Sequence, residues 1–222
     1  MDFFNKYEWL LFDFDNTLAD FTNSSNKAFK DVFSDVYTQN IHHSFHEINS
    51  KYWHYFEKGK ITGEELHYGR FKEFLETNKL TNFSETIADN YLDELLNHSI
   101  WIEGAKEMIQ KLSATHNIAI VTNGLQKIQH KRIKKLGIDK YNFPVFISEE
   151  LNSSKPNNLF FEKVHHAINS PVKNSVLVIG DNPKSDIKGG KQFGYHTCYF
   201  QYHKNKRCTV ANYTIKSWKN NA

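Results

Sequence analysis

The sequence predicts an α/β protein, in which a doubly wound parallel sheet carries an inserted bundle of helices. Short apolar runs alternate with helical patterns over residues 98–222, and this alternation is typical of a parallel sheet. Residues 21–97 contain amphipathic helical patterns but no convincing strand. We therefore predict a core domain of residues 1–20 and 98–222, and a helical domain of residues 21–97 inserted into it.

The core elements follow one another in a regular order. The first strand is predicted at residues 8–14, a nearly continuous apolar run of the kind that buried parallel strands use. Glycines follow two of the predicted helices, as expected at helix ends. Further strands are predicted at residues 117–122, 143–148, 175–180, 195–200 and 212–215, and helices at residues 104–114, 125–136, 157–168 and 183–193.

The inserted segment contains four amphipathic helices, each with an apolar face. Because the segment follows the first strand directly, at the edge of the sheet where sites form in such folds, we expect it to act as a lid. The apolar faces consist of Phe29, Phe33, Val36 and Tyr37; Phe45, Ile48, Tyr52 and Phe56; Phe71, Phe74 and Leu75; and Ile87, Tyr91, Leu92 and Leu95.

Composition narrows the class of protein. Aromatic residues make up 15% of the 222 residues, with only 10 Gly and 4 Pro, which indicates a globular chain. The net charge of +3 arises from 28 basic and 25 acidic residues, too even a balance for a nucleic-acid platform. The basic run at residues 203–207 is expected to be a solvated loop.

Cysteine spacing and apolar runs also indicate the cellular compartment of the protein. Two cysteines without C-x-x-C spacing fit a reducing compartment. We read neither a signal peptide nor a membrane span, and expect a cytoplasmic protein without a membrane partner. The histidines lack the spacing of a zinc site, and we expect none of the 12 to bind metal.

Two carboxylates end the first strand. Asp13 and Asp15 are two residues apart, so an extended chain directs both side chains the same way. Like charges this close repel each other, and a divalent cation would relieve the repulsion. By itself, the pair is weak evidence, because acidic pairs at strand ends are often simply solvated or cap a turn.

Polar groups also end the next two strands. Thr122, Asn123 and Gly124 stand at a predicted helix start, where a hydroxyl and backbone N–H groups bind an anionic oxygen well. A simple helix cap would use the same residues. Lys155 follows the third strand and offers a compact positive charge to an anion, although surface lysines in loops are common.

The fourth strand adds further carboxylates. Asp181 follows it directly and completes an oxygen-rich pocket suited to Mg²⁺. Asp186 either favours the positive end of the next helix or supports the metal site. The ends of four successive strands therefore bring carboxylates, a hydroxyl and a lysine to one edge of the sheet.

These segments carry a family resemblance. The stretches "DFDNT", "VTNG", "SKPN" and "GDNPKSD" resemble the four motifs of the haloacid dehalogenase-like (HAD) hydrolase superfamily, whose members are mostly phosphatases. The resemblance implies a Rossmann-like core with a helical cap domain of the C1 type. The stretches "FDFDNTLADF" and "ITGEELHYGRFKEFLE" look most like the pyrimidine 5′-nucleotidase branch.

The resemblance implies a role for each motif residue. Asp13 would be the nucleophile that forms an aspartyl-phosphate, and Asp15 the acid that protonates the leaving oxygen and then activates water. Arg70, in the cap, is a possible substrate contact. The metal would be held by Asp13, the backbone carbonyl of Asp15 and Asp181, with Asp186 in support, and the phosphoryl group by Thr122, Asn123, Gly124 and Lys155.

We therefore predict a Mg²⁺-dependent phosphatase that acts on a small soluble phosphomonoester, with a nucleoside 5′-monophosphate first. A sugar- or hydroxy-acid-phosphate phosphatase, a phosphomutase and a non-enzymatic phosphate sensor remain as alternatives. A haloacid dehalogenase is disfavoured, because that family lacks an acid at the position of Asp15. A response-regulator receiver domain is also disfavoured, because receivers carry these groups in a different order along the chain. The sequence does not indicate the oligomeric state.

Overall fold

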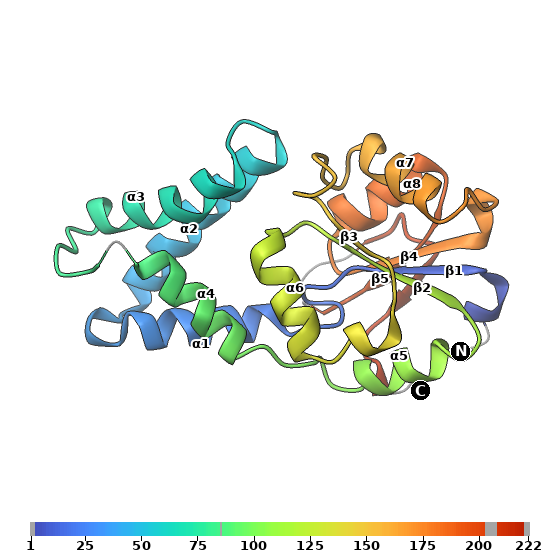
Figure 1. Cartoon of the computed structure of the whole chain (residues 1–222), viewed down its shortest axis with the longest axis horizontal. Coiled ribbons are helices and arrows are strands. Elements are labelled where there is room, and N and C mark those ends of the chain that lie inside the picture. The colour runs from blue at the N-terminus through green and yellow to red at the C-terminus, as the bar shows by residue number, and fades with distance from the viewer. Residues whose placement is uncertain (1–2, 85, 203–207, 220–222) are drawn as a thin grey trace. The chain divides into compact units, whose positions relative to one another are not determined.

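The computed structural model describes residues 3–84, 86–202 and 208–219 (Figure 1). The predicted solvated loop at residues 203–207 therefore lies outside the described residues. The chain divides into two compact units, Met1–Phe21 with Ile100–Ala222, and Thr22–Ser99. None of the helices formed by the described residues has both the length and the apolar character that crossing a bilayer requires.

The first unit contains a six-stranded sheet whose paired strands are all parallel. The strands run in the order β3-β2-β1-β4-β5-β6, which is the order of a doubly wound fold. The predicted fold class is thus confirmed. The strands are β1 (Trp9–Phe12), β2 (Asn117–Thr122), β3 (Val145–Ile147), β4 (Val176–Gly180), β5 (His196–Phe200) and β6 (Tyr213–Ile215).

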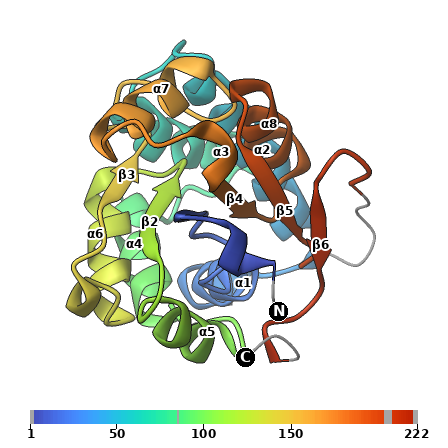
Figure 2. The same cartoon turned by 90° about the vertical axis from the view of Figure 1, so that its right-hand side faces the viewer.

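Helices cover both faces of this sheet. Figure 2 shows α5 on one side and α7 and α8 on the other. The helices of this unit are α5 (Ala105–Leu112), α6 (Gln126–Lys135), α7 (Asn158–Ala167) and α8 (Gly189–Phe193). Instead of one helix over residues 183–193, the chain forms a π-helical turn, Pro183–Lys188, followed by α8. Such wide turns often occur at functional sites.

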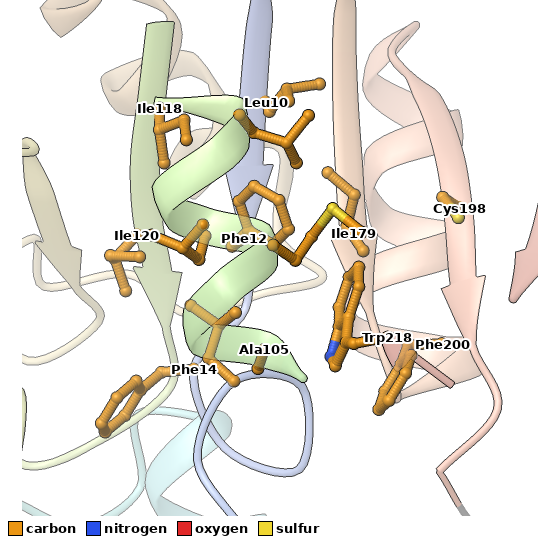
Figure 3. Close-up of a cluster of buried hydrophobic side chains, with 14 of the residues drawn as sticks. Leu10, Phe12, Phe14, Ala105, Ile118, Ile120, Ile179, Cys198, Phe200 and Trp218 are labelled. Atoms are coloured by element: carbon orange, nitrogen blue, oxygen red, sulfur yellow. The ribbon is translucent and has the colours of Figure 1, made fainter. Parts of the chain in front are cut away.

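Strand β1 lies inside the sheet between β2 and β4, and its alternating side chains fill two cores. Leu10 and Phe12 pack into the cluster that includes α5, whereas Leu11 packs into the cluster that includes α7. Figure 3 shows Leu10 and Phe12 among Ile118 and Ile120 of β2. Because β1 is buried on both faces, the point where it ends is fixed firmly relative to its neighbours.

The second unit is helical. Its helices are α1 (Phe21–Val32), of which Phe21 still belongs to the first unit, α2 (Gln39–Glu57), α3 (Arg70–Thr77) and α4 (Ile87–Asn97), with a π-helical turn at Glu65–Gly69. Phe29, Phe45 and Phe74 form an aromatic core in which ring centroids lie 4.7–5.7 Å apart. The first helix ends before Phe33 and Val36, which we predicted on its apolar face, and a 3₁₀ turn follows it.

Trp218 fastens the C-terminal segment to the core of the sheet unit. Its side chain is fully buried, its ring stacks on Phe200 at 4.8 Å, and its Nε1–H donates to the Thr17 carbonyl at 2.8 Å. Figure 3 shows the two rings side by side. The last described residues thus support the loop that follows Asp15.

We predict that Trp218→Ala lowers the free energy of unfolding of the sheet unit by about 3–5 kcal/mol, because it leaves a large cavity and removes a buried hydrogen bond. Urea denaturation followed by circular dichroism measures the loss. Val172→Ala, at a position that is 71% exposed, serves as control and should change stability by less than about 0.5 kcal/mol. A similarly small effect of Trp218→Ala would contradict the packing described here.

Candidate active site

The candidate site is built around the buried ammonium group of Lys155, whose side chain is 1% exposed. Its Nζ donates to Asp13 Oδ1, to Asp186 Oδ1 and to the Val121 carbonyl, at 2.7, 2.7 and 2.8 Å. An ammonium group has three N–H donors, and all three are used here. One lysine therefore joins the ends of β1 and β2 to the turn after β4.

The chain after β1 turns sharply. Asn16 adopts a left-handed conformation with φ of 57°, which asparagine tolerates better than most residues. Two residues beyond Asp15, the Thr17 hydroxyl donates to Asp13 Oδ2 at 3.1 Å. The Asp13 carboxylate is thus held at both oxygens, one by Lys155 and the other by Thr17.

Asn123 positions the lysine. Its side-chain oxygen accepts from the Lys155 backbone N–H at 2.9 Å, and its Nδ2 donates to the Lys155 carbonyl at 2.8 Å. The helix that we predicted from residue 125 begins one residue later, with the Gln126 N–H bonded to Glu149. Phosphate binding by Asn123 and Gly124 stays a prediction. The Asn123 side chain contacts the loop that carries Lys155.

Asp186 reaches the site from the π-helical turn. Asn182 caps this turn by accepting from the N–H groups of Lys184 and Ser185, and its own N–H donates to Asp186 Oδ2 at 3.0 Å. A Cβ on Gly180 would lie 2.3 Å from the same oxygen. Glycine at position 180 therefore leaves the space that the Asp186 carboxylate occupies.

Burial and charge set the pKa values here. Burial raises the pKa of Asp13 to about 7, against the opposing charge of Lys155, and the negative charge of Asp186 adds to the increase. Burial alone would lower the pKa of Lys155, but the charges and hydrogen bonds of Asp13 and Asp186 together raise it. A permanently charged lysine between two acids leaves the cluster with excess negative charge whenever both acids are ionised.

The donor set suits a hard cation. Oxygen atoms of Asp13, Asp181 and Asp186 all lie within 4.8 Å of one another. Two oxygens bound to one Mg²⁺ lie about 3 Å apart when cis and about 4.2 Å apart when trans, so these side chains would have to draw closer together around the ion. Carboxylates are ligands that Mg²⁺ prefers, and the excess negative charge favours a cation. The residues present therefore fit the ion.

Asp15 has different partners from Asp13. Its oxygens accept from Arg132 Nη1 at 2.6 Å and from Gln129 Nε2 at 2.9 Å, and its side chain is 25% exposed. Gln129 Nε2 also donates to the Thr122 hydroxyl at 2.9 Å. Although the two acids are only two residues apart, their side chains therefore have separate partners. The predicted metal role of Asp15 through its backbone carbonyl stays a prediction.

Gln129 and Arg132 are not among the site residues that the sequence motifs predict. Both lie on the face of α6 that also carries Ile128 and Ile133, and both are 1% exposed. Polar residues at apolar positions of an amphipathic helix are the signal that marks them. The signal is weak, because it does not tell which distant carboxylate will pair with the arginine.

Arg70 belongs to the helical unit and is 4% exposed. Its Nη1 donates to Asn49 at 2.7 Å, and its guanidinium group lies 5.1 Å from the Phe71 ring centroid and 5.5 Å from that of Tyr91. These contacts are made within its own unit. Substrate contact by Arg70 stays a prediction.

Several known proteins are similar to this chain over most of its length. Pyrimidine 5′-nucleotidase YjjG from Escherichia coli is 28% identical over 89% of this chain and 88% of its own length. Pyrimidine 5′-nucleotidase PynA from Streptococcus pneumoniae is 30% identical over 95% and 90%. A magnesium-bound crystal structure of the putative HAD-hydrolase YfnB from Bacillus subtilis superposes with a TM-score of 0.87 and 29% identity, covering 96% of both chains.

A family model matches the part of the chain that contains these motifs. The model of the haloacid dehalogenase-like hydrolases matches residues 10–200, which include the ends of the first four strands and every contact of Lys155 described above. Because this match extends over most of the sheet unit and the helical unit inserted in it, the chain belongs to the haloacid dehalogenase-like hydrolase family.

Proposed function

We propose that this hydrolase is a Mg²⁺-dependent phosphatase that acts on a small phosphomonoester through an aspartyl-phosphate. The observation that carries the proposal is the buried cluster of Asp13, Lys155 and Asp186. Asp181 lies close enough to Asp13 and Asp186 for the three acids to share one metal ion. Such a cluster places a nucleophilic carboxylate beside fixed positive charge.

In the proposed first step, an Asp13 oxygen attacks phosphorus, forming an O–P bond as the bond to the ester oxygen breaks. Asp15 gives its proton to the departing oxygen. Lys155 offsets the negative charge that the approaching phosphoryl group brings toward Asp13. When bound by Asp13, the backbone carbonyl of Asp15 and Asp181, with Asp186 in support, Mg²⁺ would supply further positive charge against this repulsion.

In the proposed second step, water attacks phosphorus and the bond to Asp13 breaks, which releases phosphate. Asp15 takes the proton of the attacking water and is thereby ready for the next substrate. Its 25% exposed side chain is accessible to that water. Thr122 and the backbone N–H groups of Asn123 and Gly124 would hold the phosphoryl oxygens in both steps.

A nucleoside 5′-monophosphate is the substrate class that we propose first, acted on in the cytoplasm. Support comes from the two curated relatives that are named pyrimidine 5′-nucleotidases and cover most of the chain. A screen for phosphate release over pyrimidine and purine 5′-monophosphates, sugar phosphates and hydroxy-acid phosphates tests this choice. A clear preference for a sugar phosphate would replace the nucleotide assignment without changing the proposed chemistry.

The wild-type protein should hydrolyse p-nitrophenyl phosphate with Mg²⁺, lose activity with a chelator and regain it when Mg²⁺ is restored. We expect Asp13→Asn to lose at least about 1,000-fold in kcat, because the amide cannot attack phosphorus. Asp139→Asn, at an exposed position of the same unit, is the matched control and should remain active. Wild-type protein inert with every divalent metal would instead favour a phosphate sensor.

Asp15→Asn should depend on the leaving group. An alkoxide needs a proton when it departs, whereas p-nitrophenolate needs little help. We therefore expect kcat/KM to fall by about 100-fold or more with an alkyl phosphate, and by a clearly smaller factor with p-nitrophenyl phosphate. Steady-state kinetics on both substrates measure the two factors; equal losses would contradict the role of Asp15 as acid.

The raised pKa of Asp13 predicts a pH dependence of stability in the presence of a chelator. Between its ordinary value of 3.8 and about 7, the folded protein binds the proton more tightly than the unfolded chain. The free energy of unfolding therefore decreases as pH rises through this window, by at most about 1.4 kcal/mol per pH unit.

Asp13→Asn removes this ionisation. The stability of the variant minus that of the wild type should increase across the same window and level off above about pH 7. Urea denaturation at several pH values measures the difference. A difference that is constant with pH would show that burial does not raise this pKa.

A further inference from the structure

Two side chains of α6 hold both oxygens of Asp15. Arg132 Nη1 donates to Oδ1 at 2.6 Å and Gln129 Nε2 to Oδ2 at 2.9 Å. The two donors are also joined to each other, because Arg132 Nη1 donates to Gln129 Oε1 at 2.9 Å. Their i, i+3 spacing brings both side chains to one face of the helix. A carboxylate fixed at two oxygens by two linked donors cannot rotate freely.

Burying the charged side chain of Arg132 costs free energy unless the charge is paired. Arg132 is 1% exposed, and removing a guanidinium group from water costs several kcal/mol unless it is paired. Its central carbon Cζ lies over the Phe14 and Phe21 rings, 4.9 and 5.4 Å from their centroids. The arginine is thus a rigid, buried support that presents its donor to a partly exposed acid.

Gln129 extends this support to the neighbouring strand end. The Nε2 group that donates to Asp15 also donates to the Thr122 hydroxyl at 2.9 Å. A Cβ on Gly124 would lie 2.5 Å from Gln129 Cγ, so glycine at this position admits the glutamine side chain. One amide group therefore sets the spacing between the end of β2 and the acid that follows β1.

We propose that Gln129 and Arg132 are positioning residues, which hold the Asp15 carboxylate in the orientation that proton transfer requires. This inference rests on the phosphatase function proposed above. The proton itself moves only between Asp15 and the ester or water oxygen. The guanidinium group and the amide keep their hydrogens throughout, and their contribution is geometric.

The test is a double-mutant cycle on Arg132 and Asp15, measured with an alkyl phosphate and with p-nitrophenyl phosphate. Arg132→Met keeps much of the side-chain volume but removes the donors. We expect its kcat/KM to fall about 10- to 100-fold with the alkyl phosphate, mostly in kcat, and clearly less with p-nitrophenyl phosphate.

In the Asp15→Asn background, Arg132→Met should change kcat/KM by less than about 3-fold, since the group that it positions can no longer transfer a proton. Arg132→Lys, which retains a charged donor, should recover part of the lost kcat. Lys134→Met, which removes a charge from an exposed position of the same helix, is the matched control and should match the wild type.

Gln129→Leu removes the neutral partner, and provides the same test if Arg132→Met does not fold. We expect the same substrate-dependent loss as for Arg132→Met. Equal losses of kcat/KM on the two substrates would overturn the inference, and so would a loss that multiplies with that of Asp15→Asn in the double variant. The phosphatase proposal would still stand in either case, provided that the wild type is active. An inert wild type would overturn both.

Discussion

The sheet unit depends on one buried charge. The Lys155 ammonium group is bonded to two carboxylates and a strand carbonyl, and none of these partners is near it in sequence. Removing such a group from water costs several kcal/mol, which only complete pairing offsets. The loops after β1, β3 and β4 are therefore joined by a contact that tolerates little rearrangement. The same contact brings the carboxylate that we propose as the nucleophile and a positive charge to one place.

The two acids of the first motif divide the proposed chemistry between them because their surroundings differ. Asp13 is buried against a lysine, which suits a group that must attack phosphorus. Asp15 is partly exposed and held from α6, which suits a group that exchanges protons with water. Two glycines make both arrangements possible: Gly180 leaves room for Asp186, and Gly124 leaves room for Gln129.

Local sequence patterns predicted the helices and strands well where an element buries one face or all of its side chains. The predicted strand at residues 117–122 coincides with β2, and the predicted helices at residues 125–136 and 157–168 differ from α6 and α7 by one residue at each end. The segment at residues 183–193 was predicted less well, because its wide turn is shaped by contacts of Asp186 and by the approach of Pro156 to Gly189. Contacts of this kind leave no periodic trace in the chain.

By itself, the sequence determined the parallel sheet, the inserted helical segment and the motifs at the ends of successive strands, because apolar periodicity and residue type are local properties. Only the tertiary structure decided which partner each acid receives. Asp15 and Arg132 are 117 residues apart, and Asp13 and Lys155 are 142 apart. Such pairs form because the sheet order places β1 between β2 and β4, so that distant loops share one edge.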